Sequence, residues 1–288
     1  MPEHNKKVDL HLHSTESDGV YSPTELVQMA SASGLSAIAL TDHETTKGIN
    51  EAINAGHKYG LEVIPGVEIS VGYNSKELHI LGYFPRNFEK LEKVLYDLRD
   101  GRYTRIAQMI DILNKMSISV NWEDIKKEIG NAAPGRLHLA RVLLKKGYVS
   151  SLEEAFNKYL DRGRPVYIPR LRLKTKEAIE LLIECNAVPV LAHPGITSEG
   201  VQTLQTLKSE GIKGIEVYHP EHSKGQTLFY EQLAKQNNLL ITGGSDFHGD
   251  ENYSVNNLNI TNFLEIDYSY LELLKVSSKK GNINEFKN

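Results

Sequence analysis

The sequence predicts an α/β fold in which helices cover a parallel sheet of about seven strands. Apolar runs of strand length alternate with segments of helical periodicity over residues 8–85 and again over residues 173–278. This alternation is typical of β-α-β units with right-handed crossovers. Histidine and carboxylate side chains recur where the predicted strands end, and residues 88–172 have helical periodicity alone. We therefore expect a closed or distorted barrel of residues 1–87 and 173–288, interrupted by a helical insertion of residues 88–172.

The composition limits the classes of protein to which this chain can belong. The chain has 288 residues, of which 40% are hydrophobic and 24% charged, and its formal net charge is -4. This charge excludes a global basic field that could hold duplex DNA. Cys185 is the single cysteine, which excludes an internal disulfide and a thiolate-rich zinc site. The chain shows neither a signal peptide nor an apolar run of membrane-spanning length, so we expect a cytoplasmic monomer without membrane contacts.

The first half of the predicted barrel contains four strands and two helices. Ser22 and Glu25 form a capping-box pattern that predicts the start of the first helix, and Gly34 predicts its end. The second helix is expected over residues 46–59, before Gly60. The run at 35–41 is apolar throughout, as in a strand buried on both faces. The predicted strands are Val8–Leu12, Leu35–Thr41, Leu61–Ser70 and Glu77–Tyr83.

The insertion and the second half of the barrel follow. Helices are expected at Phe88–Met116, Trp122–Ile129, Arg136–Lys146 and Leu152–Leu160, and later at Thr175–Asn186, Glu199–Glu210, Lys224–Asn237 and Leu264–Ser278. Strands are expected at Val188–Ala192, Gly214–Tyr218, Leu239–Thr242 and Leu258–Ile260.

Side chains suited to metal binding follow every core strand. His11 and His13 alternate on the first strand, so both point to one face. A single histidine at a strand end usually packs in the core, but repetition on strand after strand favours a metal centre at the carboxyl ends of the barrel strands. The candidate ligands are His11, His13, Asp18, His43, Glu68, His79, His193, Asp246 and His248.

This ligand set exceeds what one ion uses, so two or three divalent ions are expected, with Glu68 and Asp246 shared between them. Imidazole and carboxylate without thiolate suit manganese, zinc or iron. Closely spaced ions suit phosphoester hydrolysis, because they lower the pKa of a coordinated water and hold the oxygens of an in-line displacement. Their excess positive charge favours an anionic substrate.

Six motifs in combination resemble the PHP (polymerase and histidinol phosphatase) family: H-L-H-S-T-E-S-D-G, L-T-D-H, P-G-V-E-I, H-I-L-G-Y, A-H-P-G and G-G-S-D-F-H-G. The resemblance implies a distorted (β/α)7 barrel with a trinuclear centre, often of manganese. It implies one ion on His11, His13, Glu68 and Asp246, a second on Glu68, His79 and His193, and a third on Asp18, His43 and His248. Asp42 is expected to orient a ligand imidazole.

The insertion is similar to one subgroup through G-R-L-H-L-A-R-V-L and R-G-R-P-V-Y-I-P. Members of this subgroup remove the 3'-phosphate from nucleoside 3',5'-bisphosphates, and relatives trim short RNA from its 5' end. The resemblance implies that a phosphate which is not cleaved binds to guanidinium and imidazole groups, although these charges could also simply be solvated. The residues concerned are Arg136, His138, Arg162 and Arg164.

We therefore expect a metal-dependent phosphoesterase that acts on a small phosphorylated nucleotide or a short RNA 5' end. Glu68 and Asp246 are the expected catalytic ligands, and His219 or His222 binds substrate or protonates the leaving oxygen. One alternative is a phosphatase for histidinol phosphate or another small phosphoester, which would not need the insertion. Another is a non-catalytic, metal-stabilised PHP module, which the full ligand set disfavours.

Overall fold

The computed structural model describes residues 6–74, 76–129, 133–196, 200–249 and 263–280. The chain divides into two compact units, of which the first comprises Met1–Lys93 and Leu173–Asn288 and the second Val94–Arg172. The sequence predicts a metal-binding barrel of residues 1–87 and 173–288 and an inserted cap of residues 88–172. These boundaries and the roles of the two domains stay a prediction. Among the described residues, no helix combines the length and the apolar character that crossing a membrane requires.

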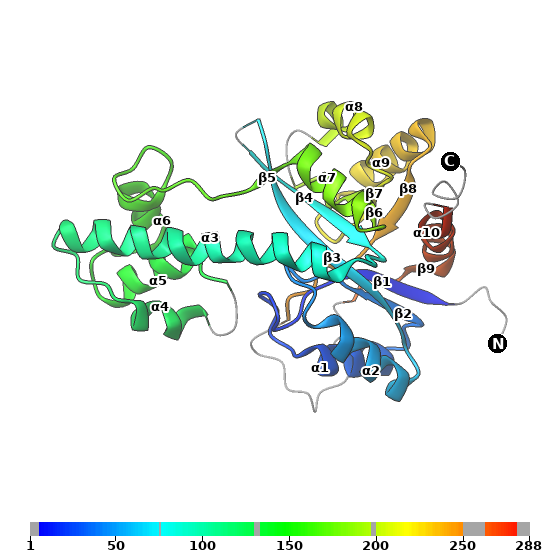
Figure 1. The fold of residues 1–288 in the computed structure, drawn as a ribbon, viewed down its shortest axis with the longest axis horizontal. Coiled ribbons are helices and arrows are strands. Elements are labelled where there is room, and N and C mark those ends of the chain that lie inside the picture. Colours follow the sequence, from blue (N-terminus) through cyan, green and yellow to red (C-terminus); the bar gives the residue numbers. More distant parts are fainter. Residues whose placement is uncertain (1–5, 75, 130–132, 197–199, 250–262, 281–288) are drawn as a thin grey trace. The chain divides into compact units, whose positions relative to one another are not determined.

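A single mixed sheet forms the body of the first unit and curves into a nearly closed barrel (Figure 1). The strand order is β8-β7-β6-β4-β3-β2-β1-β9, and β5 pairs with β3. The backbone N–H of Asp246 donates to the carbonyl of His11, and that of His13 donates to the carbonyl of Phe247. These bonds join the end of β1 to the segment after β8. The strands are β1 Lys7–Leu12, β2 Ala37–Leu40, β3 Glu62–Tyr73, β4 Lys76–Tyr83, β5 Leu173–Lys174, β6 Val188–Leu191, β7 Gly214–Tyr218, β8 Leu240–Gly243 and β9 Ile266–Asp267.

The expectation of a parallel sheet is wrong, because β4 and β9 run antiparallel to their neighbours. Strand β4 is antiparallel to both β3 and β6, and β9 is antiparallel to β1. Only two residues connect Tyr73 to Lys76, whereas a parallel crossover needs a dozen or more. The strand predicted at Leu258–Ile260 lies outside the described residues.

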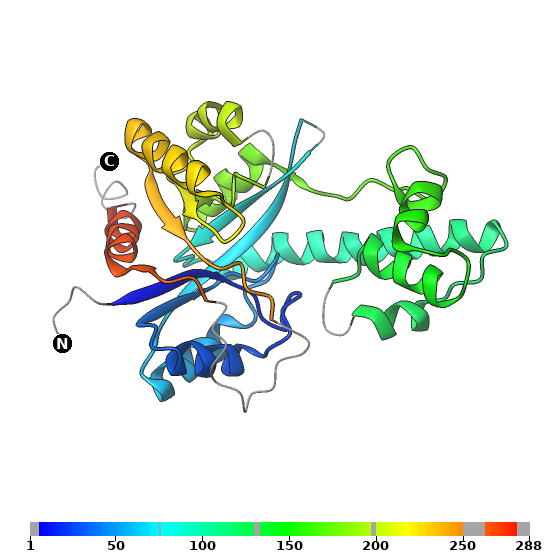
Figure 2. The ribbon, with the colours of Figure 1, turned by 180° about the vertical axis from the view of Figure 1, so that it is seen from behind.

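Helices pack on the outer side of this sheet (Figures 1 and 2). Helix α1 begins as expected, because the Ser22 hydroxyl accepts from the Glu25 N–H and the Glu25 carboxylate accepts from the Ser22 N–H. Helix α2 begins three residues later than expected, because the Thr46 hydroxyl donates to the Glu92 carboxylate at 2.7 Å. The helices are α1 Pro23–Ala32, α2 Ile49–Tyr59, α7 Thr175–Glu184, α8 Gly200–Glu210, α9 Lys224–Asn237 and α10 Tyr268–Lys280.

The second unit is helical and has a hydrophobic core of its own. Helix α3 enters it from the first unit, and Ile106, Met109 and Leu113 on α3 pack with Leu139 and Leu143 on α5. The elements are α3 Phe88–Lys115, α4 Trp122–Ile129, α5 Arg136–Lys145, α6 Leu152–Ala155 and a π-helical segment, η2 Phe156–Leu160. Because this core is separate, the unit does not need the barrel to bury its apolar side chains.

Candidate metal centre

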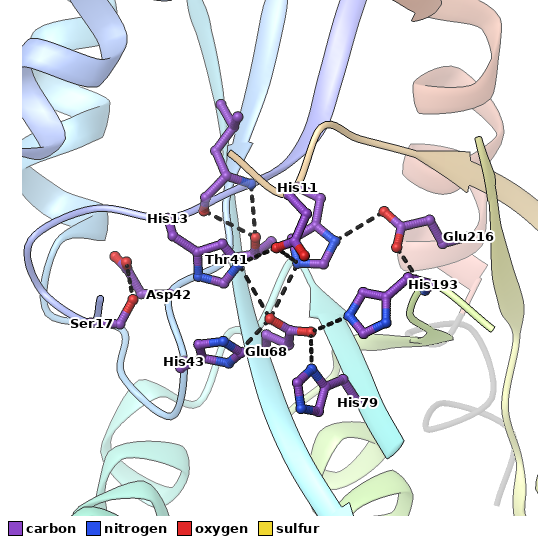
Figure 3. Close-up of polar contacts among 12 residues, drawn as sticks. His11, His13, Ser17, Thr41, Asp42, His43, Glu68, His79, His193 and Glu216 are labelled. Atoms are coloured by element: carbon purple, nitrogen blue, oxygen red, sulfur yellow. Dashed lines mark hydrogen bonds and ion pairs between the residues drawn. The ribbon is translucent and has the colours of Figure 1, made fainter. Parts of the chain in front are cut away.

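All nine predicted ligands lie together at one end of the barrel. Figure 3 labels His11, His13, His43, Glu68, His79 and His193 among them. His11 lies on β1 and His13 directly follows this strand, and period-two alternation turns both side chains to the same face. The others come from the strands β3 and β4 and from the segments that follow β1, β2, β6 and β8. These residues are distant in sequence, and the closed sheet is what brings them to one rim.

Glu68 lies at the centre of the cluster and is fully buried. Its Oε2 atom lies 3.2 Å from His11 Nε2, 3.3 Å from His13 Nε2 and 3.1 Å from His43 Nδ1. Its Oε1 atom lies 2.8 Å from His79 Nδ1 and 3.1 Å from His193 Nε2. One carboxylate thus contacts five imidazoles (Figure 3), which suits a residue that bridges cations.

Two further carboxylates complete the cluster. Asp246 Oδ1 lies 3.0 Å from His13 Nε2, and Asp18 Oδ1 lies 3.3 Å from His248 Nε2. Asp246 and His193 have positive φ angles of 53° and 24°. A side chain in this region costs on the order of 1–3 kcal/mol, and such strain is typical of functional sites.

Three groups of ligand atoms are close enough to hold an ion, namely His11, His13, Glu68 and Asp246; His13, Asp18, His43 and His248; and His43, Glu68 and His79. The first is the set that the family resemblance implies for one ion. The second contains the implied third set, with His13 added. The remaining group contains His43, whereas the resemblance implies His193 beside Glu68 and His79. His193 nevertheless lies 3.1 Å from Glu68. The division of these ligands among ions stays a prediction.

The orientation of the imidazoles fits divalent cations. Within the described part of the chain, the buried atoms His13 Nε2, His43 Nδ1 and His79 Nδ1 make no hydrogen bond of good geometry, although carboxylate oxygens lie about them. Buried polar atoms without such partners are costly. A cation placed between the nitrogens and the carboxylates would satisfy both.

The cluster perturbs the ionisation of its members. Burial lowers the pKa of His13, but the carboxylates of Asp246 and Glu68 outweigh it and raise the pKa to about 10. Burial also lowers the pKa of His79, but the carboxylate of Glu68 outweighs this effect and raises the pKa to about 9. Burial dominates at His43 and lowers its pKa to about 3. Neighbouring imidazoles hold the pKa of Glu68 well below its usual range despite its burial.

These shifts predict that metal binding releases protons. His11, His13 and His79 are expected to be protonated at neutral pH in the metal-free protein, since neighbouring carboxylates raise the pKa of His11 well above its usual value and those of His13 and His79 to about 10 and about 9, and an imidazole must be neutral to ligate. We expect roughly three protons released per chain at neutral pH and tighter binding as the pH rises toward 9. Calorimetric titration with manganese in buffers of different ionisation enthalpy measures this number. A heat that does not depend on the buffer would contradict the prediction.

Glu216, on β7, belongs to the site but was not predicted. Its Oε1 accepts from His11 Nδ1 at 3.0 Å, and its Oε2 accepts from the His193 backbone N–H at 2.8 Å (Figure 3). Burial alone would raise the pKa of its carboxyl, but His11 holds the pKa below its usual value. The available signal was a glutamate inside an otherwise apolar strand, G-I-E-V-Y, because a buried charge needs a partner.

Asp42 lies next to the ligands, but its hydrogen-bond partners are serine groups and not the ligand imidazole that the expectation assigned to it. It accepts from the Ser14 N–H at 2.6 Å, the Ser14 hydroxyl at 2.7 Å and the Ser17 hydroxyl at 2.8 Å. No direct bond joins it to an imidazole within the described residues. It holds the loop that carries Asp18, so it orients a ligand through the backbone.

The two additional histidines differ in environment. His219 Nε2 lies 3.6 Å from Asp246 Oδ2 and makes no hydrogen bond of good geometry among the described residues. In His222, by contrast, Nδ1 donates to the Val217 carbonyl at 2.9 Å and Nε2 accepts from the Gly195 N–H at 3.1 Å. Both nitrogens of His222 therefore have backbone partners.

The predicted phosphate-binding residues lie in the second unit. Arg136 Nη1 donates to the Leu160 carbonyl at 3.1 Å and lies 3.5 Å from Asp161. His138 Nδ1 accepts from the Gly135 N–H at 3.0 Å and so caps α5. Arg162 and Arg164 are exposed.

Known proteins resemble both the sequence and the fold. The PHP domain model matches residues 9–162. The 5'-3' exoribonuclease of Haemophilus influenzae is 36% identical over 248 residues, which cover 84% of this chain and 90% of that protein. The 3',5'-nucleoside bisphosphate phosphatase of Chromobacterium violaceum is 33% identical over 202 residues, covering 69% and 71%.

A crystal structure from Bifidobacterium adolescentis, assigned as a metal-dependent phosphoesterase, superposes with a TM-score of 0.76 at 27% identity. The match covers 95% of this chain and 96% of that one. Fold, ligand cluster and sequence thus agree, and the chain belongs to the PHP family of metal-dependent phosphoesterases.

Proposed function

We propose that this phosphoesterase hydrolyses the 3'-phosphate of nucleoside 3',5'-bisphosphates and trims short RNA from its 5' end. The observation that carries the proposal is the buried cluster around Glu68, in which three carboxylates face six or more imidazoles. The names of two relatives, a 5'-3' exoribonuclease and a 3',5'-nucleoside bisphosphate phosphatase, support this choice of substrate.

Divalent cations, when bound, lower the pKa of a water and stabilise charge on phosphoryl oxygens. Manganese suits the donor set, and zinc or iron would also fit it. Glu68, which belongs to two of the three ligand groups, and Asp246, which belongs to one, would hold these ions. Glu216 fixes the tautomer of His11 by accepting its Nδ1 proton, so that Nε2 faces Glu68 as a ligand atom.

His219 is the better candidate for contact with the substrate. Its Nε2 points toward Asp246 and has no competing hydrogen bond among the described residues, so it can donate to a phosphoryl or leaving oxygen. His222 has both nitrogens engaged by backbone groups, and burial lowers its pKa. We assign His222 the task of holding the loop after His193 in place.

The test is the release of phosphate from a nucleoside 3',5'-bisphosphate by protein loaded with manganese. We expect turnover of this substrate to exceed that of histidinol phosphate by at least about tenfold in kcat/KM. Equal or greater turnover of histidinol phosphate would instead support the simpler phosphatase. Absence of phosphate release, with metal content verified, would reject the substrate.

Arg136 provides a second test of the substrate. If its guanidinium binds the 5'-phosphate that is not cleaved, Arg136→Gln should raise the KM for a 3',5'-bisphosphate by about 10- to 100-fold, the loss of one charge-assisted contact. The same change should leave turnover of a nucleoside 3'-monophosphate within about twofold. The comparison of the two substrates is the internal control, since a general loss of folding would lower the turnover of both substrates.

A further inference from the structure

The segment that follows β2 carries His43, which belongs to two of the three ligand groups. The residues on either side of His43 are bonded to the backbone of Glu68. The Glu68 N–H donates to the Asp42 carbonyl at 3.2 Å, and the Glu44 N–H donates to the Glu68 carbonyl at 2.8 Å. Because His43 Nδ1 lies 3.1 Å from Glu68 Oε2, a shift of this backbone would separate two ligands of the centre.

The chain turns sharply directly after His43. Glu44 has a φ angle of 53°, in the left-handed region, and it is buried together with Thr45 and Thr46. This conformation costs a residue with a side chain on the order of 1–3 kcal/mol and persists only where the surroundings fix it. The segment of residues 43–46, which we call the His43 turn, therefore needs an anchor beyond Glu44.

The bonds within the following segment do not supply this anchor. Helix α2 begins just after the turn, and its N-cap residue is Gly48, which has no side chain that could accept from the first N–H groups. The Thr45 hydroxyl accepts from the Lys47 N–H at 3.3 Å, and the Thr46 carbonyl accepts from the Ile49 N–H at 3.2 Å. These bonds join neighbours in sequence, so they do not fix the turn relative to the ligands.

Glu92, on α3, does join the turn to a distant element. Its Oε1 atom accepts from the Thr46 N–H at 2.5 Å and from the Thr46 hydroxyl at 2.7 Å. Hydrogen bonds to a carboxylate are roughly twice as strong as those between neutral groups. Two such bonds to one residue fix both its position and its orientation. Glu92 and the His43 turn belong to the same compact unit, which includes Met1–Lys93.

Helix α3 presents Glu92 from a fixed position. Leu91 and Leu95, on either side of Glu92, are fully buried. The first turn of the helix is capped by Asn87, whose Oδ1 accepts from the Lys90 N–H at 3.1 Å. Groups carried by a packed helix are held more precisely than groups on a loop. Glu92 is therefore suited to hold a strained turn in place.

We propose that Glu92 is a positioning residue of the metal centre. By fixing Thr46, it stabilises the turn at Glu44 and so keeps His43 in place for the two ligand groups to which His43 belongs. Glu92 acts through the backbone of the His43 turn and is not itself a ligand. This inference rests on the metal binding that the proposed function requires.

The first test is a calorimetric titration of the full-length, metal-free protein with manganese. Glu92→Ala removes the acceptor and should weaken binding at the groups that contain His43 by about 10- to 100-fold. The group of His11, His13, Glu68 and Asp246 lacks His43 and should keep its affinity within about twofold. Glu92→Gln removes the charge but keeps the one oxygen that accepts both bonds, so it should bind manganese within about threefold of the unchanged protein.

A second test follows the His43 turn without metal or substrate. Hydrogen exchange of a peptide that covers residues 43–48 reports how often the backbone of the turn opens. In metal-free protein, Glu92→Ala should exchange there at least about tenfold faster, because the Thr46 N–H loses its acceptor. Exchange in Glu92→Gln should stay close to that of the unchanged protein.

Two further variants complete the design. Glu89→Ala removes an exposed glutamate from the same helix and should change neither measurement. Thr46→Val removes the hydroxyl donor but keeps the backbone bond, so it should weaken the same manganese sites by about threefold or more. Thr46→Val decides the question if Glu92→Ala folds poorly, and normal affinity and exchange in this variant would then overturn the proposal.

The outcomes also separate this inference from the proposed reaction. Weaker manganese binding and faster exchange in Glu92→Ala, with both restored in Glu92→Gln, support it. It is overturned if Glu92→Ala binds manganese normally, if Glu89→Ala or Glu92→Gln loses as much affinity, or if all manganese sites weaken equally. Neither measurement uses a phosphate ester, so a failure of the unchanged protein to release phosphate would reject only the proposed reaction.

Discussion

Glu68→Gln is expected to abolish the metal centre, with a loss of about 10³-fold or more in kcat and at least one ion lost per chain. The carboxylate of Glu68 contacts five imidazoles from four segments of the chain, and it is fully buried. Glutamine has the same size but no charge, so it cannot bridge cations or balance the surrounding positive charge. Metal analysis and phosphate release on the same sample measure both effects.

A matched control lies on the same strand. Glu62, at the start of β3, pairs with Lys275 and accepts from the Tyr268 hydroxyl. Glu62→Gln removes the same charge from the same strand, but at a position far from the imidazoles. Metal content and turnover should therefore stay near those of the unchanged protein. If Glu68→Gln retained full metal content and activity, Glu68 could not be the shared ligand.

Glu216→Gln is expected to weaken metal binding by about 10- to 100-fold, although Glu216 need not touch an ion. Its two oxygens accept from two donors, the His11 Nδ1–H and the His193 backbone N–H. A glutamine side chain has one oxygen and one NH₂ group, so it can satisfy only one donor and must point an N–H at the other. The ring of His11 or the loop at His193 is therefore displaced.

The expected signature distinguishes this role from that of Glu68. Excess manganese should restore most of the activity of Glu216→Gln, because the ligands themselves remain, but none of the activity of Glu68→Gln. Glu221→Gln changes an exposed glutamate on the same segment and is the control. If manganese did not rescue Glu216→Gln, Glu216 would have to act in the reaction itself rather than by orienting ligands.

Much of the fold could be predicted from periodicity and caps. The capping box at Ser22 located α1, and β7 and α9 have the predicted bounds. The antiparallel pairing of β4 was missed because the apolar pattern of a strand buried on both faces is the same in either direction. The late start of α2 was missed because Thr46 bonds to Glu92, which is distant in sequence.

The candidate site was predictable where its residues recur at strand ends. His11, His13 and Glu68 follow from alternation and from the position of barrel active sites. Glu216 was missed because a lone glutamate within a strand gives no sign of which distant donors it accepts from.

The central claim is that one buried cluster holds several cations and uses them to cleave a phosphate ester. The most direct measurement is the number of manganese ions per chain, titrated against phosphate release from a nucleoside 3',5'-bisphosphate. We expect activity to appear only as a second ion binds and to saturate at two or three ions per chain. Full activity with a single ion, or with none, would contradict the account.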